Sequence, residues 1–265
     1  MNTKHGFTRA LVTGASSGIG KAFAELLAQA GTDLVLVARN VERLGEIADS
    51  LRTEHGRQVE VVVADLEDRD QLSGVEQRLR EDAEIDLLVN NAGYGHTGAF
   101  GEERVDKAQG QIDCNVTALT RLAHAGLQNM LRHRRGGILN VASGAAFLPT
   151  PSLAVYAATK AYVVSLSQAL HEEAKRDGVT VTVLCPGLTR TEFQTRAKYD
   201  ASKMPSFAWQ TPEQVAQEAL AALAAGKVIC VPGIQNRVTL GLVSLIPRSA
   251  VAGLVGRVSS PQRSG

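Results

Sequence analysis

The sequence of 265 residues has few cysteines, few aromatic residues and almost no net charge. Its three cysteines lie in no CxxC spacing, which excludes a disulfide framework, and no cysteine or histidine spacing suggests a metal site. A net charge of +1 creates no field that attracts nucleic acid, so we expect no nucleic-acid partner. No apolar run has the length of a membrane span, and the first residues lack the apolar run of a signal peptide. We therefore expect a cytoplasmic protein.

The rest of the composition is that of an ordinary folded domain, with 44% hydrophobic and 21% charged residues. Short apolar segments alternate with segments of helical periodicity, and this alternation predicts a parallel sheet with helices on both faces. We therefore predict an α/β fold, a single doubly wound Rossmann-type domain with a seven-stranded parallel sheet. The predicted strands lie near 9–13, 33–38, 59–64, 85–90, 137–142, 179–184 and 227–231, and the helices near 18–30, 41–54, 68–81, 103–132, 151–176 and 211–225.

A glycine-rich segment lies between the first predicted strand and the first predicted helix. Glycines allow a tight turn and a close approach of the backbone to a phosphate, and the helix N-terminus presents unpaired N–H groups and a positive dipole. A strand before the turn and a helix after it are what a dinucleotide site requires. The alternative is a glycine turn without a ligand. We predict that the nucleotide contacts here are Gly14, Ser16, Ser17, Gly18, Ile19 and Gly20.

The second predicted strand ends at Ala38 and is followed by Arg39. In dinucleotide folds a carboxylate at this position binds the ribose 2′-hydroxyl, whereas a nearby arginine accommodates a 2′-phosphate. The absence of a carboxylate and the presence of Arg39 favour NADP(H) over NAD(H). The alternative is an ordinary surface arginine.

A tyrosine, a lysine and a serine form a candidate proton-donor site. Tyr156 and Lys160 are four residues apart within the predicted helix 151–176, so they share one face of it. A free tyrosine has a pKa of about 10, and a nearby ammonium lowers that pKa. Ser143 follows the predicted strand 137–142, at the sheet edge where ligands bind. The alternative is a Tyr–Lys pair on a solvated helix face.

Taken together, these motifs resemble the short-chain dehydrogenase/reductase family in its compact single-domain form, over about residues 8–232. No single motif is decisive, but six of them occur in the family's order. They are Thr13–Gly20, Asp65, Asn90–Gly93, Asn115, the group Ser143, Tyr156 and Lys160, and Pro186–Thr191.

The resemblance implies a role for each residue of a catalytic tetrad. Tyr156 is expected to protonate a carbonyl oxygen, Lys160 to lower the tyrosine pKa and bind the nicotinamide ribose, and Ser143 to orient the carbonyl. Asn115 is expected to help hold a water chain to the lysine, or else simply to bond backbone within its helix. The further cofactor contacts that the resemblance implies are Asp65, Leu66, Asn91, Ala92, Gly93, Pro186, Gly187, Thr189 and Thr191. The family also implies homodimers or homotetramers, formed through helices near 110–132 and 151–176.

The residues expected around the substrate are mostly apolar, which favours a hydrophobic ketone or aldehyde over a sugar. Beside Ser143, we expect contacts from Tyr94, Phe147 and Phe193, and we interpret His96 either as a polar substrate contact or as a surface residue. The sequence thus predicts an NADP(H)-dependent, metal-free oxidoreductase that interconverts a carbonyl and an alcohol. The alternatives are a cofactor-binding sensor without catalysis and a protein that acts by docking to a partner.

Two segments extend the predicted core. The long connection 188–210, here called the flap, is expected to be mobile and to cover the substrate. We assign residues 1–233 to the nucleotide-binding domain and 234–265 to an amphipathic extension of it. Pro247 divides that extension into two predicted short helices, and we expect them to pack on the body or on a second subunit. Weak contact with a membrane surface is the alternative.

Overall fold

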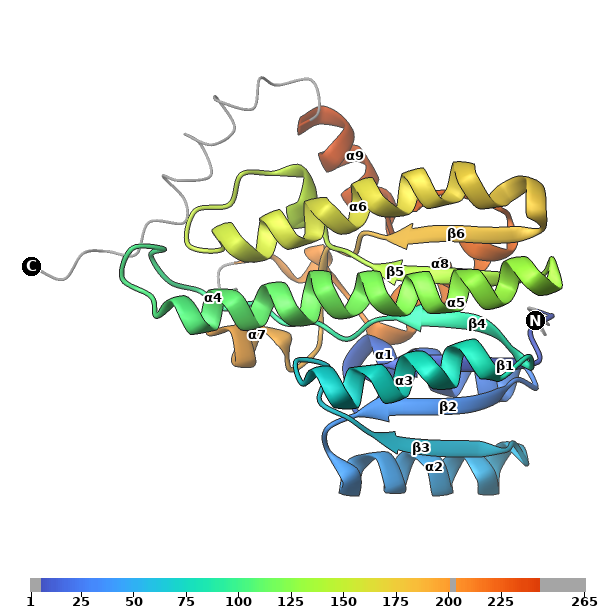
Figure 1. The fold of residues 1–265 in the computed structure, drawn as a ribbon. Helices are drawn as coiled ribbons and strands as arrows, with labels where there is room; N and C mark the ends of the chain where they lie inside the picture. Colours follow the sequence, from blue (N-terminus) through green and yellow to red (C-terminus); the bar gives the residue numbers. More distant parts are fainter. Residues whose placement is uncertain (1–5, 201–203, 244–265) are drawn as a thin grey trace, which may run out of the picture.

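The structure is a computed structural model that describes residues 6–200 and 204–243. Its main sheet has seven strands in the order β3-β2-β1-β4-β5-β6-β9, and every neighbouring pair is parallel (Figure 1). The predicted doubly wound sheet is thereby confirmed. The strands are β1 (Arg9–Thr13), β2 (Asp33–Ala38), β3 (Val59–Val63), β4 (Ile85–Asn90), β5 (Gly136–Val141), β6 (Val179–Leu184) and β9 (Ile229–Cys230).

Helices cover both faces of this sheet, and each face has its own apolar core. One core packs α1, α2 and α8 against the strands, and the other packs α3, α5 and the end of α6 against the opposite face. The strands at the middle of the sheet, β1, β4 and β5, are almost wholly buried, as expected for a parallel sheet. The helices are α1 (Gly18–Gln29), α2 (Val41–His55), α3 (Arg69–Glu81), α4 (Val105–Ile112), α5 (Leu119–His133), α6 (Ala154–Ala174), α7 (Phe193–Ala197), α8 (Pro212–Ala224) and α9 (Ile234–Val243).

The prediction of one continuous helix over 103–132 is wrong. The chain forms α4, then a π-helical segment from Asp113 to Ala118, and then α5. Short π-helical segments occur most often at functional sites, and this one contains Asn115. Periodicity does not reveal such a segment, because it adds a single residue to one turn.

The carboxyl ends of the seven strands meet at one edge of the sheet, to which the strand arrows of Figure 1 point. Strand β1 lies at the centre of this edge, between β2 and β4. From β1 the chain continues to β2 and β3 on one side of the sheet, and later strands starting with β4 lie on the other side. Such a switch point is where doubly wound sheets bind ligands. Along the flap, a two-residue strand β7 (Leu188–Thr189) pairs in parallel with β8 (Trp209–Gln210).

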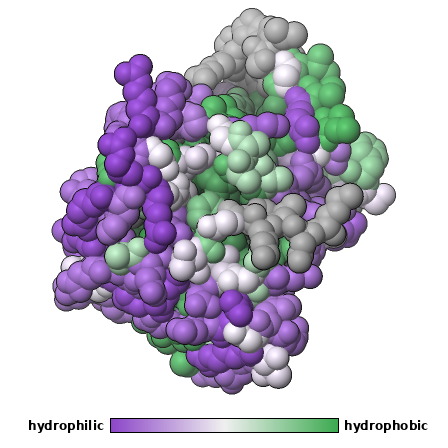
Figure 2. All heavy atoms as spheres, turned by 90° about the vertical axis from the view of Figure 1, so that its right-hand side faces the viewer, coloured by the Kyte–Doolittle hydropathy of each residue, from purple (hydrophilic) through white to green (hydrophobic). Residues whose placement is uncertain are grey.

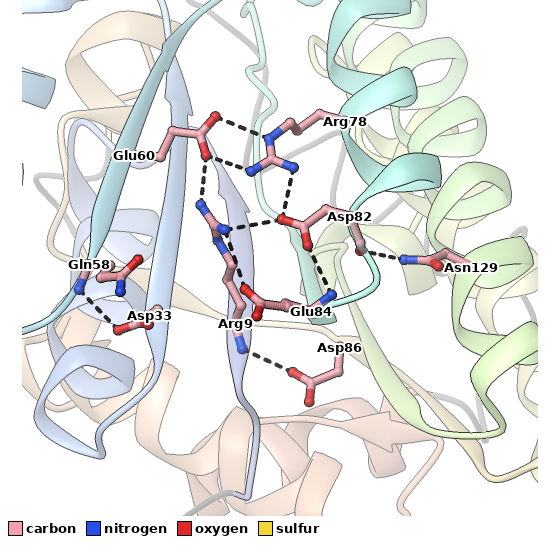
Figure 3. Close-up of polar contacts among 9 residues, drawn as sticks. All are labelled: Arg9, Asp33, Gln58, Glu60, Arg78, Asp82, Glu84, Asp86 and Asn129. Atoms are coloured by element: carbon pink, nitrogen blue, oxygen red, sulfur yellow. Dashed lines mark hydrogen bonds and ion pairs between the residues drawn. The ribbon is translucent and has the colours of Figure 1, made fainter.

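The opposite edge of the sheet is held by a network of charged side chains, drawn in Figure 3. Arg9 of β1 lies 2.7 Å from Glu60 of β3 and 3.2 Å from Asp82, which follows α3. Arg78 of α3 contacts the same two carboxylates at 2.7 and 2.8 Å. Two guanidinium groups and two carboxylates thus join β1, β3 and α3 at the edge remote from the switch point.

At the end of the described chain, α9 is the first of the two helices predicted beyond residue 233. The second, predicted after Pro247, lies outside the described residues. Within residues 6–200 and 204–243, no helix combines the length and the apolar character needed to cross a membrane.

Candidate active site

Tyr156 and Lys160 lie one turn apart on α6, and both side chains are buried at the carboxyl edge of the sheet. The Lys160 ammonium donates a hydrogen bond of 2.8 Å to the carbonyl oxygen of Val141, the last residue of β5. Its Nζ lies 5.8 Å from the centre of the Tyr156 ring. The two groups expected to move a proton therefore sit together, fixed to the central sheet.

Burial dominates the electrostatics of this pair. Burial raises the pKa of Tyr156 to about 12, although its hydrogen bond with Ser143 acts in the opposite direction. Burial also lowers the pKa of Lys160 to about 8. Both shifts arise because desolvation disfavours the charged form of each group. That Lys160 lowers the tyrosine pKa stays a prediction. At neutral pH Tyr156 is protonated, which is the form that can donate a proton.

Ser143 immediately follows β5 and Ala142, and its hydroxyl accepts a hydrogen bond from the Ala145 N–H at 3.1 Å. This bond fixes the oxygen at the start of a 3₁₀ turn, Gly144–Phe147. The structure places the Ser143 hydroxyl within hydrogen-bonding distance of Tyr156.

Asn115 is fully buried within the π-helical segment. Its amide donates to the Tyr94 carbonyl at 2.8 Å and to the Thr159 hydroxyl at 3.1 Å, and its oxygen accepts from the Tyr94 N–H at 3.0 Å. A Cβ atom added to Gly93 would lie 2.8 Å from this oxygen and 3.2 Å from the Lys160 ammonium. Asn115 therefore bonds to the loop after β4 and to α6, rather than to the backbone of its own helix.

The glycine-rich turn after β1 has the geometry of a phosphate-binding loop. Gly14 and Gly18 adopt positive φ angles of 65° and 56°, which are strained for residues with a side chain. At Gly20 a Cβ atom would lie 2.3 Å from the Gly14 carbonyl oxygen. Below the turn, the Thr13 hydroxyl accepts hydrogen bonds of 3.0 Å from the N–H groups of Asn91 and Ala92. This hydroxyl joins the turn to the loop that follows β4.

The N-terminus of α1 begins at this turn and is suited to an anion. Its first turn contains no acidic residue, and in the described part of the chain the Ser17 hydroxyl does not cap the helix. The first N–H groups of the helix and their positive dipole therefore face the loop without a competing carboxylate. These features fit the pyrophosphate of a dinucleotide. Ile19 and Leu66, by contrast, pack their side chains into the two cores, which leaves their backbone groups for cofactor contact.

Arg39 lies at the end of β2 with its side chain 65% exposed. Its Nη1 is 3.4 Å from Asp65 and 3.9 Å from Glu67. The guanidinium therefore stands over the loop after β3, available to a phosphate but already near two carboxylates. The pKa of the Glu67 carboxyl group is raised, mainly by burial and secondly by the nearby negative charge of Asp65.

The segment 186–191 connects the two halves of the site. At one end the Pro186 carbonyl oxygen accepts a hydrogen bond of 2.8 Å from Gly144, the neighbour of Ser143. At the other end the methyl group of Thr191 lies 3.1 Å from the position of a Cβ at Gly18. Between them, the Thr189 hydroxyl donates to the Gly187 carbonyl at 3.2 Å. The segment therefore spans the space between the proton donor and the phosphate-binding turn.

On the substrate side, Phe193 lies against Tyr156, with ring centres 5.2 Å apart. A Cβ atom added to Gly95 would meet Tyr156 at 3.0 Å and Phe193 at 3.1 Å. The backbone of this loop bonds to the flap through Thr97 N–H and Ala197 O at 3.0 Å. Tyr156, Phe193 and the loop after β4 therefore form one apolar wall.

Other residues predicted to contact substrate point elsewhere. The Tyr94 hydroxyl lies 3.4 Å from Glu67, toward the loop after β3. Phe147 packs against the core formed by α6, β5 and β6. The Nε2 atom of His96 lies 3.0 Å from a carboxylate oxygen of Glu103. This geometry favours roles for these three side chains in holding loops.

Two polar residues of the site were not identified from the sequence, namely Glu67 and Thr159. Thr159 is 3% exposed and bonds both to Asn115 and to the Tyr156 carbonyl, at 3.1 and 2.7 Å. Its position three residues after the tyrosine, on the same helix face, is the one signal that could have identified it.

Comparison with known proteins agrees with this geometry. Residues 8–202 match the short chain dehydrogenase family. The very-long-chain 3-oxoacyl-CoA reductase of Anas platyrhynchos is 32% identical over 263 residues, which are 96% of this chain and 81% of that protein.

Two solved structures are similar over almost the whole chain. A short-chain dehydrogenase from Sphingobium yanoikuyae in complex with NADPH is 36% identical with a TM-score of 0.84, covering 98% of both chains. The bulky-bulky ketone specific alcohol dehydrogenase from Comamonas testosteroni is 32% identical with a TM-score of 0.80, covering 98% of this chain and 97% of that one. The chain belongs to the short-chain dehydrogenase/reductase family of oxidoreductases.

Proposed function

We propose that this protein uses NADP(H) to interconvert a ketone or aldehyde and an alcohol on an apolar substrate, with Tyr156 as general acid and base. The observation that carries the proposal is the position of the buried Tyr156 side chain at the carboxyl edge of the sheet, beside Lys160 and Ser143.

The chain's own residues fit a dinucleotide. The glycine turn and the N-terminus of α1 would bind the pyrophosphate. Because Gly93 has no side chain, the nicotinamide ribose could come close to the Lys160 ammonium. Arg39 is the side chain at the end of β2 that would bind a 2′-phosphate. When bound, NADPH supplies the hydride for reduction of the carbonyl carbon.

The protein's contribution to the chemistry is the movement and stabilisation of a proton. The Ser143 hydroxyl orients and polarises the carbonyl oxygen, and Tyr156 donates its proton to that oxygen. The Lys160 ammonium, held by the Val141 carbonyl, stabilises the phenolate that develops. Asn115 fixes the loop after β4 against α6, so that the space around the lysine keeps its shape.

The apolar wall beside Tyr156 supports a hydrophobic substrate, such as an acyl, steroid-like or aromatic ketone. Phe193 and the tightly packed Gly95 loop offer aromatic and backbone surface rather than a set of hydrogen-bonding side chains. Two of the relatives described above are named for acyl-CoA and bulky-ketone substrates, which supports the same class.

For assembly, we propose a homodimer or homotetramer formed through α4, α5 and α6. Ile112 and Tyr162 are exposed apolar or aromatic side chains on the α4 and α6 surfaces, which supports this choice. Light scattering of the purified protein tests it, and a monomer at micromolar concentration contradicts it.

The C-terminal extension carries a separate proposal, weak contact with a membrane surface. Ile234, Val238 and Leu242 form an exposed stripe along α9. Figure 2 shows hydrophobic side chains gathered in the upper part of one face, at the height that α9 occupies in Figure 1. Flotation with anionic vesicles, before and after replacement of the stripe by serine, tests this contact.

A panel of carbonyl compounds, assayed with NADPH and with NADH, tests the main proposal. We expect faster turnover of hydrophobic ketones than of sugars, and a higher kcat/KM with NADPH than with NADH. Tight NADPH binding without turnover of any carbonyl would favour a sensor instead.

A further inference from the structure

The segment 186–191 is bonded to the backbone of β8, and the side chain of Asn236 packs against it. Leu188 and Thr189 pair with β8, and the Arg190 N–H donates to the Gln210 carbonyl at 2.9 Å. Gln210 is 5% exposed, so its side-chain amide has little access to water and depends on protein partners.

Asn236, in the first turn of α9, supplies one of those partners. Its Nδ2 donates to the Gln210 side-chain oxygen at 2.9 Å and to the Pro232 carbonyl at 2.8 Å. The start of α9 is itself fixed to α8, because Glu218 accepts from the Gly233 N–H at 3.1 Å and pairs with Arg237 at 2.9 Å. Asn236 is therefore anchored independently of the site.

The same amide packs directly on Gly187. A Cβ atom added to Gly187 would lie 2.6 Å from both Nδ2 and Oδ1 of Asn236. The absence of a side chain at Gly187 thus lets Asn236 reach the backbone of the segment. On the far side of Gly187, the segment is bonded through Pro186 to Gly144, beside Ser143.

We propose that Asn236 is a positioning residue for hydride transfer: through Gly187 and Gln210 it fixes the segment that lies between Ser143 and the phosphate-binding turn. This inference rests on the proposed function and adds α9, outside the family-matched residues 8–202, to the machinery of the reaction. Asn236 acts on the reactive end of the site, whereas Arg39 and the glycine turn bind the other end of the cofactor.

The test compares Asn236→Leu, which keeps a similar volume without hydrogen bonds, with Thr239→Ala as a matched control. Thr239 is exposed on the same helix and bonds only to Gln235 of that helix among the contacts of the described residues. We expect Asn236→Leu to lower kcat for carbonyl reduction about tenfold or more, since a displacement of about 1 Å in a site costs up to ~10²-fold. The Kd of NADPH should change less than about threefold, because the phosphate contacts remain.

Two further readouts separate positioning from a loss of folded protein. With deuterated NADPH, the isotope effect on kcat should increase in Asn236→Leu, because hydride transfer becomes slower relative to product release. Trp209 is the chain's only tryptophan and precedes Gln210 in β8. Fluorescence energy transfer from Trp209 to bound NADPH should therefore also change in Asn236→Leu. Gly187→Ala, which displaces Asn236, should reproduce both effects.

Equal kcat and equal isotope effects in Asn236→Leu and wild type would overturn the positioning role while leaving the proposed function intact. A fall in kcat that matches the loss of NADPH-binding sites would also overturn it, since that result means only misfolding. A wild-type protein that neither binds NADPH nor reduces any carbonyl would overturn both proposals.

Discussion

At the scale of single residues, the site is defined by burial more than by charge. Tyr156 and Lys160 could be identified from their spacing, but their pKa values could not, because spacing does not report how completely α6 is covered. The structure shows both groups desolvated, with the tyrosine pKa at about 12 and the lysine pKa at about 8. A tyrosine that is protonated at neutral pH suits the reductive direction.

The lysine pKa leads to a prediction about pH. Because burial lowers the pKa of Lys160, the ammonium is present below about pH 8 and is lost as the pH rises through that value, earlier than in an exposed lysine. We expect kcat for carbonyl reduction to fall above about pH 8, since the charge that stabilises the developing phenolate disappears. A profile of kcat against pH that stays level well beyond this value contradicts the role assigned to Lys160.

A second residue-scale prediction concerns cofactor choice. Arg39→Asp places a third carboxylate beside Asp65 and Glu67, so a 2′-phosphate is repelled rather than bound. We expect the Kd of NADPH to rise more than about tenfold while that of NADH changes little, which moves the preference toward NADH. Arg39→Gln, which removes charge without reversing it, should fall between the two. Titration of each variant with NADPH and with NADH measures these Kd values. An unchanged cofactor preference would mean that a group other than Arg39 binds the 2′-phosphate.

At the scale of elements, the sequence predicted the sheet well and the connections poorly. Apolar runs and the glycine turn located the seven strands and α1, because buried parallel strands and a phosphate loop have strong local signals. The π-helical segment around Asn115 has no such signal, since its register depends on hydrogen bonds to Tyr94 and Thr159. The directions of Tyr94 and Phe147 likewise depend on tertiary packing, which spacing does not encode.

The flap is linked to α2 by an ion pair that crosses the cofactor side of the molecule. Arg43, in the first turn of α2, lies 3.0 Å from Glu192, which follows Thr191 and precedes α7. Both side chains are close to half exposed. Arg43 lies near Arg39, and Glu192 lies near Gly18, so the ion pair joins two sides of the expected cofactor site. We expect this link to slow the release of the cofactor.

We predict that Glu192→Gln increases the dissociation rate of NADPH about two- to fivefold, because an exposed ion pair contributes only modestly. Stopped-flow displacement measures this rate. Asp106→Asn, which removes an exposed ion pair with Arg104, serves as the control. Equal rates in all variants would show that the link does not limit release.

At the scale of the whole molecule, the two edges of the sheet have different tasks. The carboxyl edge carries the site, whereas the amino edge carries the charged network of Figure 3. The side chain of Asp82 is 9% exposed and contacts both Arg9 and Arg78. Removing it leaves two partly buried guanidinium groups with one carboxylate fewer.

We expect Asp82→Ala to lower the free energy of unfolding by about 1–3 kcal/mol, the usual cost of a lost partner for a buried charged group. The value of kcat should stay within about twofold, because the network lies at the edge remote from Tyr156. Glu172→Ala, which removes the exposed pair with Lys175, should change the free energy of unfolding much less than Asp82→Ala does. Urea denaturation and steady-state assays measure the two effects, and a large loss of kcat in folded Asp82→Ala would contradict the separation of the edges.

A single-turnover experiment on Tyr156→Phe is the most direct test of Tyr156 as the proton donor. Protein saturated with NADPH is mixed with a hydrophobic ketone, and the oxidation of the bound cofactor is followed in wild type and variant. We predict that the variant binds NADPH with a similar Kd but oxidises it at least a hundredfold more slowly, the size expected for loss of a general acid. A loss of less than about tenfold would remove Tyr156 from that role, since general acid–base catalysis contributes about 10²–10⁴-fold.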